Sequence, residues 1–365
     1  MVIGASTVAA VRVALDVTPL LGAGSGVAAV VDGLLRSLAS RNNPPEIVTW
    51  TMSGRDRGDG GVGATPLALP AAIARPLWRL TGRPRADKRL GFPDVVHGTN
   101  YVVPPCKTAT LVSVYDLSFI HEAASTSRSV KRFDSTVRAA VRRGAVIHTT
   151  AHVIGRELEE RYNAEVVVVA PGIEPRAPRQ QLARSRYIAG VGTAMKRKNF
   201  PLLIDAFAEI AVDRPDVELL LAGASGRDSD AIDDALASLP AELRGRARHL
   251  GRLGDADLDA LVEGAAVLAH PSRYEGFGLP ILEAMSAGVP VVAADAGAAT
   301  EVAANAGLLV AADDSQALAA GLAKVLDDEG LAADMALSGT ERAGEFTWDR
   351  SAKQMMQLYT DLASR

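Results

Sequence analysis

The sequence contains very little cysteine and few aromatic residues. Its 365 residues include one cysteine, Cys106, and aromatic side chains make up only 4%. A single cysteine excludes an intrachain disulfide, a thiolate zinc cluster and an iron–sulfur site, and it fits a reducing compartment. Scarce aromatic residues argue against a base-stacking platform, so we expect no nucleic-acid partner.

Long hydrophobic runs are also missing. No stretch reaches the roughly 20 apolar residues that a membrane-spanning helix requires. Residues 1–17 are interrupted by Arg12 and lack the basic start and cleavage site of a signal peptide. We therefore expect a cytoplasmic protein.

The composition is that of a two-domain globular chain with unequal halves. Apolar residues make up 48% and charged residues 22%, which fits a substantial core, and the length predicts two domains. Residues 1–170 hold 20 Lys and Arg against 14 Asp and Glu, and residues 171–365 hold 19 against 29, which gives +6 and −10. We expect the halves to face different partners.

Short β-branched runs alternate with helix-length segments, which is typical of parallel βαβ units. Most runs are nearly unbroken apolar segments, as expected where helices cover both faces of a sheet. The expected strands are 11–17, 46–52, 94–97, 110–115, 145–149 and 166–170 in the first half, and 186–190, 217–222, 248–250, 266–270, 289–293 and 307–310 in the second. This pattern predicts an α/β protein with two Rossmann-like domains.

Turn-rich segments suggest the domain boundaries. We expect an N-terminal domain over 1–170, a proline-rich interdomain linker over 171–185, a C-terminal domain over 186–345 and a final helix over 346–365. Segment 53–66 is rich in glycine and charge and is predicted to be a surface loop. In 348–364 the apolar residues have helical spacing, which predicts one packed face.

The most informative stretch is 270–295, HPSRYEGFGLPILEAMSAGVPVVAAD. We expect a strand that ends at 270, a turn over 275–279 and a helix over 280–287, with Pro280 in its first turn, where a missing N–H is harmless. The free amides of Gly278, Leu279 and the residues that open this helix would point at an anion, and the helix dipole would attract it. The segment therefore predicts a phosphate site.

Two glutamates, Glu275 and Glu283, flank this phosphate site. Gly276 and Gly278 let the backbone approach the ligand, so the carboxylates can bind hydroxyl groups on either side of the phosphate. That arrangement suits a nucleotide sugar. The alternative is that Glu275 caps the helix and Glu283 is simply solvated.

The stretch YEGFGLPILEAMSAGVPVVA resembles the signature of the family-four retaining glycosyltransferases, a glutamate, seven residues and a second glutamate. GTAMKRKNFPLLIDAF (192–207) is similar to their basic donor loop, AGAATEVAANAGLLV (296–310) to the segment after the signature, and FTWDRSAKQMMQLY (346–359) to a terminal helix that crosses back to the first domain. The first half resembles them less, through Gly24-Ser25-Gly26, DVVHGTNYVVPP (94–105) and VYDLSF (114–119). The resemblance implies the GT-B fold, in which two Rossmann-like domains with parallel sheets face each other across a cleft.

The resemblance also implies roles for the donor site. Arg197, Lys198 and Glu275 are the expected catalytic residues: the cations bind the diphosphate and stabilise its charge as the glycosidic bond breaks, and Glu275 binds the donor sugar. Glu283 is expected to bind the ribose. The donor-binding set is Gly24, Gly26, Arg197, Lys198, Glu275, Gly276, Phe277, Gly278, Leu279, Pro280 and Glu283. The alternatives are a solvated basic turn over 196–198 and a plain glycine turn before a helix over 24–26.

His97, Tyr115 and Asp116 are expected on the acceptor side, because each lies at or just after a strand's carboxyl end. Similar sequences carry histidine where Tyr115 stands and arginine where Thr193 stands, so this chain departs from the family pattern at both positions. A buried structural role is the alternative for His97.

We expect no metal ion and no cofactor. The Asp-x-Asp pairs Asp228/Asp230, Asp255/Asp257 and Asp257/Asp259 are interpreted as a loop and as a helix N-cap with a polar face. The cations and the helix end already supply positive potential at the expected diphosphate.

Two basic runs account for the positive first half. The first is Arg75, Arg79, Arg83, Arg85, Lys88 and Arg89, near Trp78, and the second is Arg128, Lys131, Arg132, Arg138, Arg142 and Arg143. They are either solvated helix faces or a surface for an anionic membrane or a lipid-linked acceptor, with Pro76, Leu77 and Trp78 inserting shallowly. The second interpretation places the protein at the inner face of the plasma membrane.

The predicted function is transfer of a sugar, with retention, from a nucleoside diphosphate sugar to an acceptor hydroxyl on a glycan or glycolipid. Mannose or a deoxysugar such as rhamnose is the expected sugar, with a guanine donor slightly favoured. The alternatives are a nucleotide-sugar epimerase and a catalytically inactive GT-B binding subunit, which the departures at Tyr115 and Thr193 would fit.

Overall fold

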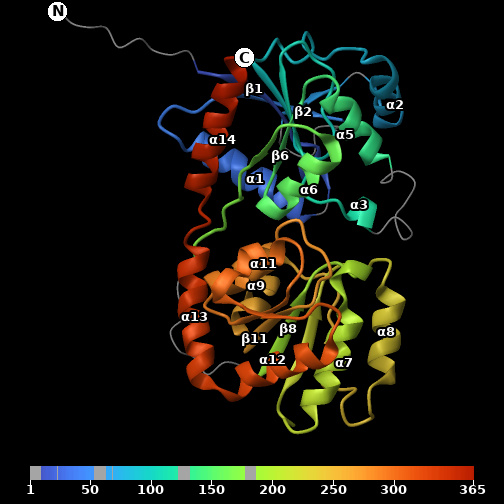
Figure 1. Ribbon diagram of the computed structural model, residues 1–365, viewed down its shortest axis with the longest axis vertical. Coiled ribbons are helices and arrows are strands. Elements are labelled where there is room, and N and C mark those ends of the chain that lie inside the picture. Colours follow the sequence, from blue (N-terminus) through green and yellow to red (C-terminus); the bar gives the residue numbers. More distant parts are fainter. Residues whose placement is uncertain (1–9, 23, 53–62, 68, 122–131, 177–185) are drawn as a thin grey trace, which may run out of the picture. The chain divides into compact units, whose positions relative to one another are not determined.

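The computed structural model describes residues 10–22, 24–52, 63–67, 69–121, 132–176 and 186–365 (Figure 1). The chain divides into two compact units. Unit 1 comprises Met1–Thr150, Gly155–Gly172 and Trp348–Arg365, and unit 2 comprises Ala151–Ile154 and Ile173–Thr347. Most of the predicted linker (177–185) and of the predicted surface loop (53–62) lies outside the described residues.

Unit 1 is built on a parallel seven-stranded sheet in the order β3-β2-β1-β4-β5-β6-β7. Its strands are β1 (Arg12–Asp16), β2 (Glu46–Thr51), β3 (Thr65–Pro66), β4 (Val95–Gly98), β5 (Ala109–Ser113), β6 (Val146–Thr149) and β7 (Val166–Val168). Its helices are η1 (Thr18–Leu21), α1 (Gly26–Ala39), α2 (Ala71–Thr81), α3 (Ser118–His121), α5 (Phe133–Val141), α6 (His152–Tyr162) and α14 (Trp348–Ala363).

Unit 2 is built on a parallel six-stranded sheet in the order β10-β9-β8-β11-β12-β13. Its strands are β8 (Tyr187–Val191), β9 (Glu218–Ala222), β10 (Ala247–His249), β11 (Val267–His270), β12 (Val291–Ala294) and β13 (Leu308–Val310). Its helices are η2 (Lys196–Lys198), α7 (Phe200–Ala211), α8 (Ser229–Ser238), α9 (Asp255–Gly264), α10 (Leu279–Ser286), α11 (Ala298–Ala303), η3 (Ala304–Ala306), α12 (Ser315–Asp327) and α13 (Glu329–Ala343).

These two sheets confirm the prediction of two Rossmann-like α/β domains, and every predicted strand is present to within a few residues. One further strand is present that the sequence did not predict, because β3 lies inside the segment predicted to be a loop. It has only two residues, one of them Pro66, and pairs with β2 at the edge of the sheet, so it carries almost no strand signal.

In each sheet the strand order reverses once, between β1 and β4 in unit 1 and between β8 and β11 in unit 2. At such a point the connections leave to opposite sides, and the carboxyl ends of the two strands are left open to a ligand. The segments that follow β1, β4, β8 and β11 are therefore where binding residues are expected.

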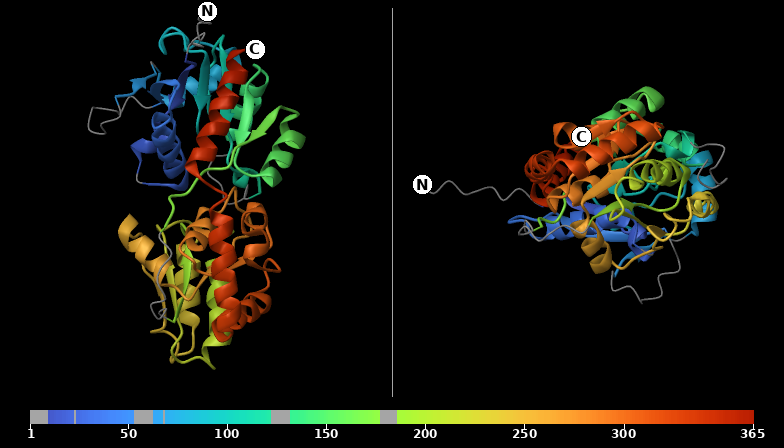
Figure 2. Two further views of the ribbon diagram at one scale, coloured as in Figure 1. Left: turned by 90° about the vertical axis from the view of Figure 1, so that its left-hand side faces the viewer. Right: turned by 90° about the horizontal axis from the view of Figure 1, so that it is seen from below.

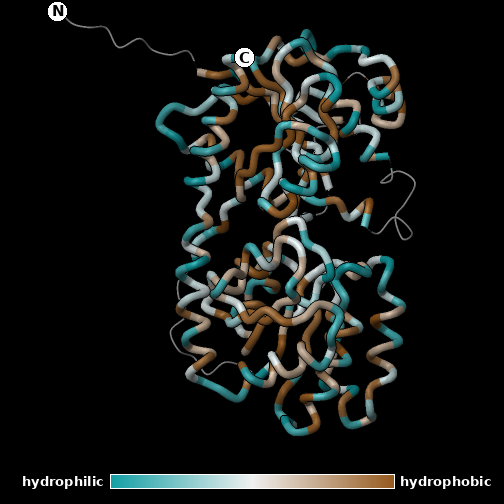
Figure 3. Tube along the Cα trace, viewed as in Figure 1, coloured by the Kyte–Doolittle hydropathy of each residue, from teal (hydrophilic) through white to brown (hydrophobic). Residues whose placement is uncertain are grey.

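Each unit has its own hydrophobic core between the sheet and its helices. Figure 3 shows the strands as mostly hydrophobic segments and the outer turns of the helices as more hydrophilic ones. In unit 2, Phe200, Leu203 and Phe207 of α7 pack against Leu219 and Val267 on neighbouring strands. This burial fixes the sheets and so holds their carboxyl edges in place.

The last helix of the chain belongs to the first unit. Figures 1 and 2 show α14 running along the unit 1 sheet beside α1. Ala352, Met355, Tyr359 and Leu362 are buried there, as their helical spacing predicts. Ser37 on α1 donates a hydrogen bond to the carbonyl oxygen of Trp348 (2.8 Å), which fixes the start of α14.

Gly33 makes the close approach of α1 and α14 possible. A Cβ atom at Gly33 would lie 2.1 Å from the Trp348 ring. An alanine inside a helix is normally about 1 kcal/mol more stable than glycine. Here we expect Gly33→Ala to destabilise unit 1 by about 1–3 kcal/mol, because the overpacked Trp348 must move.

Urea unfolding followed by tryptophan fluorescence measures this effect, because all three tryptophans, Trp50, Trp78 and Trp348, lie in unit 1. Gly22→Ala is the matched control, since the nearest atom to its Cβ would be 4.0 Å away and its backbone is extended. A Gly33→Ala midpoint at or above that of Gly22→Ala would contradict the packing described for α1 and α14.

Candidate active site

Three predicted site residues meet at the switch point of unit 2. Lys198 and Arg197 lie in η2, which follows β8, and Glu275 follows the neighbouring strand β11. The Nζ atom of Lys198 donates a hydrogen bond to Oε1 of Glu275 (2.6 Å), and the Nη1 atom of Arg197 donates one to Oε2 (3.0 Å). One carboxylate is thus shared by two cations.

The ion pair between Lys198 and Glu275 is buried. Each side chain is only 8% exposed, so the idea of a solvated basic turn is wrong for Lys198. Burial by itself would raise the pKa of Glu275, but the charges of Lys198 and Arg197 hold it well below its ordinary value. Glu275 is therefore an anion, and the group of three keeps one net positive charge.

A histidine that we had assigned no role touches the same carboxylate. His270 is the last residue of β11, and its buried Nε2 lies 3.4 Å from Oε1 of Glu275. Burial lowers the pKa of His270, with the attraction of Glu275 opposing this effect. Its position at the carboxyl end of the strand before the motif was the available signal.

Polar contacts fix the basic turn itself. Arg273 donates from its backbone to the carbonyl of Arg197 (2.8 Å) and from its side chain to that of Lys196 (3.0 Å). Asn199 ends the turn in the left-handed region, with φ 56°, and its amide donates to Asp313 (3.0 Å). These contacts hold Arg197 and Lys198 toward Glu275.

The start of α10 is as the motif predicted, one residue earlier than expected. Gly278 precedes the helix at φ 103°, a conformation that favours glycine, and Pro280 lies in its first turn. No side chain caps the helix, so the alternative role of Glu275 as a cap is wrong. The ring of Phe277 is buried against Phe346, with centroids 5.7 Å apart, so this side chain packs inside unit 2.

Glu283 lies in the second turn of α10 and is half-buried, so it is not a solvated residue. Burial raises its pKa, against the attraction of Arg176. Arg176 itself binds Asp259 (2.5 Å) and Glu263 (3.2 Å). Among the residues that the structure describes, none donates a hydrogen bond to the Glu283 carboxylate.

The predicted acidic pairs have structural surroundings. Asp259 is bound to Arg176, and Asp255 begins α9 after an N-cap at Gly254, which confirms the expected helix N-cap followed by a polar face. Asp230 lies in the first turn of α8, where a loop was expected, because the helix begins at Ser229. Within the described ranges no group of three or more His, Cys, Asp or Glu is arranged to hold a metal.

Comparison with known proteins agrees with this geometry. A family model described as glycosyl transferases group 1 matches residues 175–342. O-antigen chain mannosyltransferase B of Escherichia coli is 28% identical over 282 residues, which cover 73% of this chain and 74% of the relative. D-inositol 3-phosphate glycosyltransferase of Corynebacterium aurimucosum is 29% identical over 309 residues, with 74% and 72% covered.

Solved structures share the fold. Sucrose-phosphate synthase from Thermosynechococcus elongatus superimposes with a TM-score of 0.76 at 20% identity, covering 97% of this chain and 99% of that one. HepE from Anabaena, solved with UDP and glucose, gives 0.71 at 18% identity, with 96% and 100% covered. Residues 175–342 thus match the group 1 glycosyltransferases, and the chain as a whole has the GT-B fold.

In unit 1, the glycine turn after β1 opens a helix. Ser25 caps α1 by accepting a hydrogen bond from the backbone N–H of Ala28 (3.2 Å), and Gly24 and Gly26 are exposed beside it. The Ser25 cap is the folding role that we gave as the alternative for this turn. The donor-binding role expected for Gly24 and Gly26 stays a prediction.

Tyr115 and Asp116 follow β5, as expected, and both are half-buried. The Tyr115 ring lies edge-on to His148, with centroids 6.2 Å apart, and burial raises the pKa of its hydroxyl. Asp116 accepts hydrogen bonds from the Tyr101 hydroxyl (3.0 Å) and from Ser118 Oγ (2.8 Å). One carboxylate oxygen of Asp116 is therefore already hydrogen-bonded, and these bonds hold the segment after β5 in place.

The expectation that His97 lies on the acceptor side is wrong. His97 is fully buried, and its two ring nitrogens share hydrogen bonds with the Tyr359 hydroxyl and with Ser113 Oγ, each at 2.8 Å. Ser113 is bonded in turn to His148 (2.8 Å). This chain of polar groups ties α14 to β4, β5 and β6, and it leaves His97 no nitrogen for a substrate.

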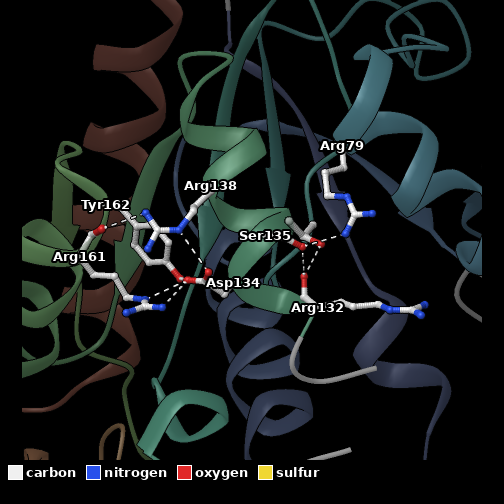
Figure 4. A network of polar contacts seen from close by, with 8 residues as sticks. Arg79, Arg132, Asp134, Ser135, Arg138, Arg161 and Tyr162 are labelled. Carbon is white, nitrogen blue, oxygen red and sulfur yellow. Dashed lines mark hydrogen bonds and ion pairs between the residues drawn. The ribbon is translucent and has the colours of Figure 1, made fainter. Parts of the chain in front are cut away.

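The second basic run is a solvated face only in part, because Arg132, Arg142 and Arg143 are exposed and Arg138 is half-buried. Arg138 and Arg161 both bind Asp134, which also accepts a hydrogen bond from Tyr162 (Figure 4). Arg143 donates to the carbonyl of Trp78 (3.2 Å). These contacts bring α5 together with α6 and α2. Arg128 and Lys131 of this run lie outside the described residues.

The first basic run needs two corrections. Trp78 lies on the buried face of α2, so it cannot insert into a membrane. Arg75 is turned inward and half-buried, unlike Arg79 one turn later, which is exposed and donates to Ser135 (Figure 4). The i, i+4 spacing of Ala74 and Trp78 was the available signal for the buried face of α2, whereas the charged side chain of Arg75 gives no apolar signal.

The buried histidines make the stability of unit 1 sensitive to acid. Burial lowers the pKa of His97 well below 6.5 and that of His148 to about 4. The unfolded chain then binds protons that the folded chain excludes, so stability is full above about pH 6.5 and falls toward pH 4. Asp16, whose pKa burial raises to about 6, acts in the opposite sense and offsets part of one proton.

We expect the urea midpoint of the tryptophan signal to fall as the pH is lowered from 6.5 to 4. The free energy of unfolding should decrease with a slope that approaches about 1.4 kcal/mol per pH unit for each excluded proton. His148→Gln should reduce that slope by roughly one proton while lowering stability at pH 7. An unchanged slope in His148→Gln would show that His148 titrates alike in the folded and unfolded states.

No helix in the described part of the chain is long and apolar enough to span a membrane.

Proposed function

We propose that this enzyme transfers a sugar, with retention, from a nucleoside diphosphate sugar to an acceptor hydroxyl. The observation that carries the proposal is the buried group of Lys198, Arg197 and Glu275 at the switch point of unit 2, next to the open start of α10. A diphosphate suits this place because two cations and a helix N-terminus act on one position.

The relatives indicate the kind of substrate. One is named a mannosyltransferase and another an inositol phosphate glycosyltransferase, and a solved neighbour of similar fold holds UDP and glucose. A mannosyl or deoxysugar group is accordingly our proposal for the donor sugar, and a hydroxyl on a glycan or glycolipid for the acceptor.

In the proposed mechanism the cations change partners. When the donor binds, Arg197 and Lys198 turn from Glu275 to the diphosphate oxygens, and the freed carboxylate accepts hydrogen bonds from hydroxyls of the donor sugar. The cations then stabilise the negative charge that grows on the diphosphate as the glycosidic bond breaks. The Glu283 carboxylate accepts no hydrogen bond from a described residue, and in this mechanism it binds the ribose hydroxyls.

Retention follows if the acceptor attacks from the face that the diphosphate leaves. A donor phosphate oxygen takes the proton of the acceptor hydroxyl, so no protein base is required at Tyr115, whose raised pKa suits it only for hydrogen bonding. We also propose that no metal ion is needed, because Arg197, Lys198 and α10 supply the positive potential and Asp259 is held by Arg176.

The test replaces the charged partners. Glu275→Gln and Lys198→Ala should each lower transfer by at least about a hundredfold, the scale expected when a transition-state charge partner is lost. Lys196→Ala is the matched control, because Lys196 lies in the same turn but its side chain is exposed. Transfer is measured with GDP-mannose, UDP-glucose and dTDP-rhamnose as donors, and circular dichroism verifies the fold of each variant.

Donor binding is measured in parallel by thermal stabilisation, in which a ligand at 100 times its dissociation constant adds about 2.7 kcal/mol. Wild-type turnover in Glu275→Gln would contradict the assigned roles. Conversion of the donor without any acceptor would indicate an epimerase, and stabilisation by a donor without turnover would indicate a binding subunit.

A surface of α2 and the segment after it suits an anionic membrane. Ile73 (56% exposed) and Leu80 (76%) lie seven residues apart on one face of α2, and Phe92 (68%) follows. Exposed cations accompany them at Arg79, Arg83, Arg85, Lys88 and Arg89. The one acid in 71–93, Asp87, is buried and accepts from the backbone of Lys107. We propose that this surface, in place of Trp78, meets the membrane that carries the acceptor.

The double variant Ile73→Glu/Leu80→Glu should reduce binding to phosphatidylglycerol vesicles by at least about tenfold, because two apolar side chains are lost and two anions added. Val212→Glu/Leu337→Glu, at exposed positions of unit 2, is the control. Sedimentation with phosphatidylglycerol and with phosphatidylcholine vesicles gives the measurement. Equal binding by both double variants would exclude α2 as the contact.

A further inference from the structure

The proposed change of partners leaves the Glu275 carboxylate without its two cations. Its side chain is only 8% exposed, and burial by itself would raise its pKa. In this structure Lys198 and Arg197 oppose that effect, but both turn to the diphosphate when the donor binds. A buried carboxylate without a charged partner tends to take up a proton, and it then loses the strong hydrogen bonds that an anion accepts from sugar hydroxyls. The donor complex therefore needs another group that stabilises the anion.

His270 is in place to be that group. Besides the two cations, it is the titratable side chain of the described chain that acts on Glu275. Its ring is 2% exposed, and its Nε2 atom lies 3.4 Å from Oε1 of Glu275. This distance is longer than an ordinary N–H···O hydrogen bond, and the atoms are not aligned for one. The buried Nε2 of His270 is thus within reach of the carboxylate but not yet bonded to it.

The backbones of both residues are fixed. His270 ends β11 and is paired with Ala293 of β12. The carbonyl oxygen of Glu275 accepts a hydrogen bond from the backbone of Ala298 (3.1 Å), at the start of α11. Gly297, at φ 56°, allows this contact, because a Cβ there would lie 3.1 Å from both the backbone nitrogen and the oxygen of Glu275. A shift of the two side chains alone can therefore complete the hydrogen bond.

We propose that His270 is a positioning residue, whose Nε2 donates a hydrogen bond to Glu275 once the donor has drawn Lys198 and Arg197 to its diphosphate. This inference rests on the proposed function. Burial, together with the charges of Lys198 and Arg197, holds the pKa of His270 below its ordinary value, so the ring is neutral and has one proton to donate. His270 acts through Glu275: it keeps the carboxylate charged and directed at the sugar hydroxyls, and it takes no part in breaking a bond.

The experiment compares His270→Met with His270→Gln. The two replacements are similar in length, but only glutamine has an N–H that can take the place of Nε2. Dissociation constants of GDP-mannose, UDP-glucose and dTDP-rhamnose are measured by calorimetry, and transfer is measured with the donor that the wild type binds best. His270→Met should weaken donor binding and lower transfer by at least about tenfold, whereas His270→Gln should keep both within about threefold of the wild type.

A double-mutant cycle with Glu275→Gln shows whether His270 acts through that carboxylate. Glu275→Gln removes the charge that His270 is proposed to stabilise. In this background His270→Met should change the dissociation constant of the donor by less than about twofold, because no anion is left to hold. A ring that only fills space would cost the same in both backgrounds. Circular dichroism verifies that every variant is folded, since all three tryptophans lie in unit 1 and do not report on unit 2.

Three results, each with a wild type that binds and transfers, would overturn the role of His270 alone. They are wild-type donor binding and transfer in His270→Met, a loss in folded His270→Gln as large as that in His270→Met, and an equal loss in the two backgrounds of the cycle. A wild type that neither binds nor transfers any of the three donors would refute the proposed function, and the role of His270 with it.

Discussion

The site depends on a buried carboxylate held between two cations. Removing the charges of Lys198 and Glu275 from water costs several kcal/mol for each, and a buried ion pair often adds little net stability. The pair keeps both groups charged and in place, because Lys198 donates a hydrogen bond to the Glu275 carboxylate at 2.6 Å. A donor diphosphate can then replace the carboxylate as the partner of the cations without either group having to change protonation.

The fold brings these groups together from segments far apart in the chain. Glu275 and Lys198 are 77 residues apart, yet they follow neighbouring parallel strands at the place where the strand order reverses. The same reversal in unit 1 sets Asp16 beside the turn after β4. One topological rule thus leaves the ends of two strands open in each unit, and the side chains at those ends decide what can bind there.

Much of this arrangement follows from the sequence because its signals are local. Unbroken apolar runs mark the strands, and glycine, proline and two glutamates in a fixed order mark the start of α10. The failures have a common cause in side-chain direction. His97 lies at a strand end like Tyr115, but its ring turns into the core toward Tyr359, a residue 262 positions away. Trp78 and Arg75 lie in a basic segment, but packing against α5 and the sheet turns both inward.

Net charge proved a poor guide to the group at Lys198. The second half of the chain carries −10, yet its site holds two cations against one carboxylate. The surplus charges lie at the surface, where water and salt screen them within about 10 Å. At the buried ends of β8 and β11 the nearest groups act on a ligand most strongly, so an acidic half of the chain can still hold a cationic group that suits an anion.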